Sequence, residues 1–79
     1  MKLKDAIANR VKELCDENEL TVHGLSLKTG VANSTLVDIV KARNSSIQIK
    51  FIYSICAGLG MSFTDFFNSP LFNFENLVD

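Results

Sequence analysis

Three consecutive polar residues, Asn33, Ser34 and Thr35, stand at the expected start of a helix over residues 32–41. The Asn33 amide both donates and accepts hydrogen bonds, which suits the edge of an adenine, and a Ser hydroxyl can bond to either kind of base. One turn later, the Val37 methyl groups suit contact with a thymine methyl. Because Asn, Ser and Thr are also common helix caps, simple capping is the alternative interpretation.

A group of basic and polar residues follows the same expected helix. Lys41 lies at its end, and Arg43 and Asn44 lie in a loop over residues 42–46. Such side chains bind backbone phosphates of a nucleic acid, which fixes register without reading sequence. The loop is therefore a candidate phosphate clamp.

These candidate residues need a scaffold of short helices that bury one face. In the first segment the apolar residues Leu3, Ile7, Val11 and Leu14 recur at helical spacing. Caps and glycines delimit the other segments, and the whole chain is expected to be all-α. The predicted helices cover residues 4–17, 22–28, 32–41, 49–59 and 63–68, followed by a tail over residues 69–79.

Thr21 and Gly30 delimit the second predicted helix. Thr21 is a good N-cap, and Gly30 supplies the left-handed residue that ends the helix. The unpaired N–H groups at such a helix start can also bind a phosphate. Thr21 thus joins the candidate binding residues.

The chain resembles the Cro and phage-repressor (XRE-type) family of helix-turn-helix domains over about residues 3–67. Short motifs in a fixed order and spacing carry the resemblance: Leu20-Thr21, Leu25, Thr29-Gly30-Val31, Ser34-Thr35-Leu36, Ile39, Lys41, Ile55, Leu59-Gly60, Ser62 and Phe66-Phe67. The resemblance implies a compact five-helix domain over residues 1–68 whose third helix enters the DNA major groove. It also implies that the contacts to double-stranded DNA come from Thr21, Asn33, Ser34, Thr35, Val37, Lys41, Arg43 and Asn44.

Four positions differ from the pattern usual in that family. An Arg and a Glu that commonly pair are replaced by Cys15 and Val40, so we expect these two to meet in the core at apolar contact distance, roughly 4 Å. Val22 replaces a Gln that often bonds to phosphate. Asp38 replaces a basic or polar residue, and it either accepts from a cytosine amino group or lies at the edge of the contact.

Charge is unevenly distributed along the chain. The formal net charge is −1, but residues 21–50 carry Lys28, Lys41, Arg43 and Lys50 against a single acid, whereas residues 51–79 carry three acids and no base. Positive charge therefore gathers around the predicted DNA-facing element. For Arg10, outside this region, the alternatives are an ordinary solvated charge and a contact to backbone phosphate.

No catalytic or metal-binding pattern stands out. The single His23 lies in a predicted first turn and is expected to face solvent. Cys15 and Cys56 have no C-x-x-C spacing and are expected to be reduced core thiols. We expect no enzyme activity, no cofactor and no metal. No stretch reaches the roughly 20 apolar residues of a membrane span, so no membrane contact and a cytoplasmic location are expected.

The tail over residues 69–79 is unusually apolar, with Leu71, Phe72, Phe74, Leu77 and Val78. It is expected either to fold back onto the domain or to contact a second copy or another protein. The favoured function is a sequence-specific transcriptional regulator, a repressor-type DNA-binding protein acting as a homodimer. The alternatives are an antitoxin whose tail faces its toxin, and an interaction module that has kept the fold without DNA binding.

Overall fold

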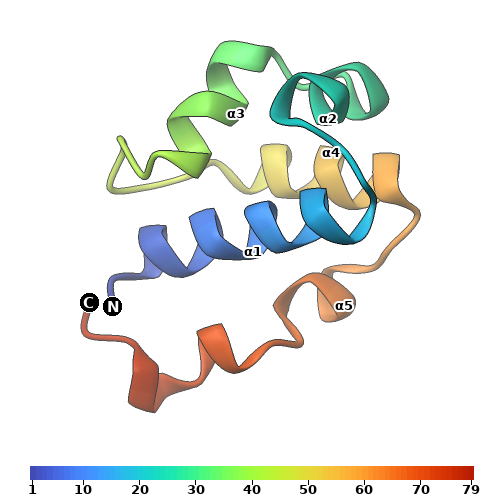
Figure 1. Cartoon of the computed structure of the whole chain (residues 1–79). Helices are drawn as coiled ribbons and strands as arrows, with labels where there is room; N and C mark the ends of the chain where they lie inside the picture. The colour runs from blue at the N-terminus through green and yellow to red at the C-terminus, as the bar shows by residue number, and fades with distance from the viewer.

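The computed structural model describes all residues 1–79 and contains only helices, as the sequence predicts. Five α-helices are followed by two short 3-10 helices that run back beside the first helix, so that the two chain ends lie together (Figure 1). The elements are α1 Leu3–Glu17, α2 Val22–Thr29, α3 Asn33–Val40, α4 Ile49–Leu59, α5 Phe63–Phe67, η1 Pro70–Phe72 and η2 Phe74–Asn76.

One apolar core joins the five α-helices. α1 contributes a stripe that includes fully buried Val11, and Leu25, Leu36, Ile55 and Phe66 from the other four helices are also fully buried. Helices this short are marginal in water unless an apolar face is packed. The core is therefore what keeps α2 and α3 in place.

Cys15 and Val40 both lie in this core, on α1 and α3, two helices that pack against each other. Neither position carries a charge, so no buried charge is left without a partner there. Burial raises the pKa of both the Cys15 and the Cys56 thiols, which keeps them protonated and unreactive.

α2 and α4 approach so closely that only glycine fits at one position. A Cβ atom added to Gly58 would lie 2.6 Å from Thr29 Cγ2 and 2.9 Å from Thr29 Cα. Gly58, the last residue but one of α4, therefore serves the packing of α4 on α2, although glycine is unfavourable in an isolated helix.

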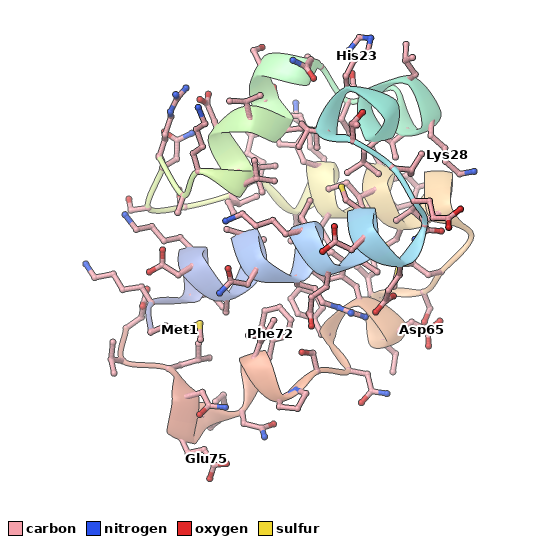
Figure 2. The ribbon with its side chains drawn as sticks, in the orientation of Figure 1. Met1, His23, Lys28, Asp65, Phe72 and Glu75 are labelled. Atoms are coloured by element: carbon pink, nitrogen blue, oxygen red, sulfur yellow. The ribbon has the colours of Figure 1, made fainter.

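The tail folds back onto the domain. Phe72 points from η1 toward α1 (Figure 2) and packs edge-on against Phe67, with ring centroids 4.9 Å apart. The Val78 N–H donates to the Met1 carbonyl at 3.0 Å. Folding back covers only part of the apolar surface, since Phe74 is 91% exposed.

Arg10 is neither a solvated charge nor available for a phosphate contact, so both predictions for this residue are wrong. Its side chain is only 11% exposed and reaches the C-terminal end of α5. Nε donates to the Phe66 carbonyl at 2.6 Å and Nη2 donates to the Asp65 carbonyl at 2.8 Å, while the guanidinium lies 6.0 Å from the centre of the Phe66 ring. Arg10 thus caps α5 and attaches it to α1.

We expect Arg10→Met to lower the free energy of unfolding by about 1.5–3 kcal/mol, because two charge-assisted hydrogen bonds are lost and the Phe66 carbonyl loses its donor, while the Asp65 carbonyl keeps the Asn68 N–H. Urea denaturation measures the change. The control is Lys12→Met, an exposed position on the same helix, with an expected effect within about 0.5 kcal/mol. Equal stability of the two variants would contradict the capping role.

Candidate nucleic-acid interface

The start of α3 presents three polar side chains that make no hydrogen bond within the protein. Asn33 and Ser34 are exposed and Thr35 is half-buried. The N-cap is Ala32, which has no side-chain acceptor, so the capping interpretation of the three polar residues is wrong. Their hydrogen-bonding groups and the first-turn N–H groups of α3 face outward without an intrahelical partner.

The outer face of α3 continues with polar and charged groups. Ser34, Asp38 and Lys41 recur at spacings of four and three residues, whereas Leu36 and Ile39 face the core. Val37 is half-buried beside this outer line. A single polar stripe therefore runs along α3 from its first turn to its end.

α2 places a second helix start at the same end of the molecule. Thr21 is the N-cap as predicted, and its hydroxyl accepts from the Gly24 N–H at 3.0 Å. The first N–H groups of α2 remain without an intrahelical partner, which suits an anion. His23 projects outward from the first turn of α2, whereas Lys28 lies at the far end of that helix (Figure 2).

The turn between α2 and α3 is held by hydrogen bonds that set the angle between the helices. Gly30 has the left-handed φ of 79° that the sequence predicts. The Ser26 hydroxyl donates to the Val31 carbonyl at 2.6 Å, and the Val31 N–H donates to Thr29 Oγ1 at 3.3 Å. These contacts position the start of α3 relative to the start of α2.

The loop after α3 is ordered by a Schellman motif that has alanine where glycine is usual. Ala42 has a positive φ of 51°. The Ala42 N–H donates to the Ile39 carbonyl, and the Arg43 N–H donates to the Asp38 carbonyl, both at 3.0 Å. The backbone of the candidate clamp is therefore tied to the last turn of α3.

Asp38 and Arg43 form an ion pair, with 3.0 Å between Oδ1 and Nη1. The two side chains are 40% and 55% exposed, so the pair contributes little to stability and can open without large cost. Asp38, which departs from the pattern of the resembling family, here orients the guanidinium of the loop arginine.

A notch of about 170 Å³ lies between α3 and the loop that leads to α4. Thr35 and Asn44, both predicted site residues, line it together with Asp38. Ser46 and Gln48 also line it and were missed, because nothing in their residue types or spacing marks them. Only the return of the loop alongside α3 reveals them.

All eight predicted residues reach the surface at least in part. Six of them are exposed, including the N-cap Thr21, and the other two, Thr35 and Val37, are half-buried on α3. The structure groups the three polar residues with the α2 start, and separately groups Lys41, Arg43 and Asn44 around the end of α3. The remaining basic residue of α2, Lys28, lies outside both groups.

No group of three or more His, Cys, Asp and Glu residues is placed to hold a metal ion. No helix of the chain combines the length and the apolar character needed to cross a membrane.

Comparison with known proteins supports the fold. No family model matches the chain, and no curated protein matches it. Among solved structures, it is similar to the crystal structure of the prophage Lp1 protein 11, with 28% identity and a TM-score of 0.78. The match covers 89% of this chain and 93% of that protein, so most of the helical arrangement is shared with a prophage protein.

We expect Ala42→Gly to raise the free energy of unfolding by about 0.5–1 kcal/mol, because a left-handed conformation costs an L-residue about 1–2 kcal/mol and glycine loses part of this gain through its larger unfolded-state entropy. Glu19→Gly, at φ 55°, should behave alike. Lys12→Gly, in an exposed helix interior, should instead destabilise by about 1 kcal/mol. A destabilised Ala42→Gly protein would rule out strain at this turn.

Proposed function

We propose that the protein is a sequence-specific, double-stranded DNA-binding transcriptional regulator of the phage-repressor type. The observation that carries the proposal is that the polar side chains at the start of α3, Asn33, Ser34 and Thr35, make no hydrogen bond within the protein and face outward beside the α2 start. An α-helix of this kind fits the major groove and meets base edges through its first residues.

Phosphate contacts on either side complete the proposed interface. The α2 N-terminus at Thr21 would bind one phosphate through its N–H groups. Lys41, Arg43 and Asn44 would hold the backbone at the other end of α3, and Arg43 would exchange Asp38 for a phosphate. The likeness to a prophage protein supports a phage-type regulator.

Two copies acting on two half-sites fit this role. Half-sites one helical turn apart, about 34 Å, would let a homodimer double the number of contacts that one small domain makes. A repressor of this type needs no ligand-binding domain, since occupancy then follows protein concentration.

Protein binding through the tail is a second candidate function, the role of an antitoxin facing its toxin. Phe74 and Val78 stay 91% and 74% exposed although the tail is folded back.

An interaction module without DNA binding would show no dependence of affinity on salt, whereas phosphate contacts give a steep decline of log affinity with log salt.

The proposal is tested by selecting bound sites from a random duplex pool and measuring affinities by fluorescence anisotropy. We expect Asn33→Ala to lose about 1–3 kcal/mol on the selected site and to relax preference at one base pair. We expect Arg43→Ala to weaken binding to all duplexes alike and to reduce the salt slope by about 1.

The matched control for Arg43→Ala is Lys28→Ala, which also removes one positive charge but at the far end of α2. It should leave sequence preference unchanged. Two results would refute the proposed function. One is no binding to any duplex even at low salt, and the other is a sequence preference that Asn33→Ala does not change.

A further inference from the structure

The outer face of α4 carries large apolar side chains that no part of the chain covers. Ile49 and Tyr53, four residues apart, are 62% and 61% exposed, and Ala57 continues the line by another four. Phe63, at the start of α5, is 42% exposed, and its ring lies 6.4 Å from that of Tyr53. Together these four residues form what we call the α4 strip.

The two ends of the α4 strip differ in shape. At the end nearer α5, a groove of about 290 Å³ opens between Tyr53, Ala57, Met61 and Phe63. At the other end the Ile49 side chain projects into solvent. The strip therefore has an apolar projection at one end and an apolar hollow at the other, eight residues or roughly 12 Å apart along the helix.

This shape is self-complementary. In a two-fold pair each contact occurs twice, so residue i of one copy meets residue j of the other and the reverse. If two α4 helices lie antiparallel, Ile49 of each copy falls over the groove of the other, and the two Tyr53 side chains meet near the axis. A different protein would have to supply both a projection and a hollow at matching spacing.

The charges at the two ends of the α4 strip are also complementary in an antiparallel pair. Lys50 is exposed at the end that carries the projection, and Asp65 is exposed on α5 at the end that carries the groove. An antiparallel pair places each Lys50 toward the Asp65 of the other copy, and it also opposes the dipoles of the two helices. A parallel arrangement would bring like charges together at both ends.

We infer that the α4 strip is the surface on which a second copy of this chain docks, with the two α4 helices antiparallel. Ile49, Tyr53 and Phe63 expose on the order of 300 Å² per copy, given side-chain areas of about 150–250 Å² for the aromatic residues. This is less than half of the roughly 800 Å² that a standard interface buries per partner, so the dimer is weak, with a dissociation constant on the order of micromolar.

The docked copy does not cover α2. α4 packs on α2 through Gly58, which lies on a different side of α4 from Tyr53 and Ala57 at 100° per residue. The inference rests on the proposed function only for its biological use, namely two reading helices on one duplex. The pairing itself is measured without DNA.

Sedimentation equilibrium across the micromolar range tests the pairing. We expect a monomer–dimer equilibrium in the unaltered protein, and a dissociation constant raised about 30-fold or more by Ile49→Asp, as for the loss of an interface residue that fills an apolar pocket of the partner. The matched control is Phe74→Asp, which puts the same charge at a more exposed apolar position on the tail and should leave the equilibrium unchanged. Circular dichroism should show that both variants remain helical, so that a changed equilibrium reflects pairing and not unfolding.

Cross-linking tests the antiparallel geometry. Tyr53→Cys should form a disulfide-linked dimer on oxidation, because the two copies of residue 53 lie next to the axis, while Cys15 and Cys56 are buried. Phe74→Cys should cross-link no faster than by random collision. A protein that stays monomeric, or a dimer that Phe74→Asp disrupts as strongly as Ile49→Asp, would overturn the inference. Loss of DNA binding with the dimer intact would count against the proposed function alone.

Discussion

The burial of one stripe of α1 is the constraint on which the rest of the molecule depends. α1 has 15 residues, whereas α2 and α3 have eight each and α5 has five, lengths at which a helix in water is marginal or unstable. Each short helix persists because one apolar residue, such as Leu25 or Phe66, is fully buried in the shared core. The candidate site therefore has no stability of its own and takes its geometry from the core.

The same constraint leaves polar groups at the helix ends. With Leu36 and Ile39 in the core, the other face of α3 is left to hydroxyls, an amide and charges. The two helix starts are held at a defined angle by the bond from Ser26 to the Val31 carbonyl. A polar stripe on a short helix can read a partner only if its angle is set in this way, since small misplacement removes directional hydrogen bonds.

Apolar and charged surfaces are separated around the molecule. The candidate nucleic-acid interface gathers polar and basic groups around α3, and the α4 strip gathers exposed apolar groups on α4 and at the start of α5. A net charge of −1 conceals this division, because the acids lie mainly in α1 and after residue 51. Local charge, not the total, decides what each face can bind.

Residues near one another in the chain determined the helices and several of their ends. Apolar spacing sufficed for α1 and α4, and Thr21, Gly30 and Ser62 marked caps that the structure contains, because the hydrogen bonds of a cap join residues only a few positions apart. The outward position of Asn33, Ser34 and Thr35 followed from the same periodicity.

Only the tertiary structure decided the rest. Arg10 meets a carbonyl 56 positions away, and no local pattern marks such a partner. The turn at Ala42 is a local exception: its hydrogen bonds reach only three and five positions back, but it lacks the glycine that usually signals a left-handed residue. The fold-back of the tail likewise depends on η1 packing against α1 and on the Val78 N–H reaching the Met1 carbonyl at the other end of the chain.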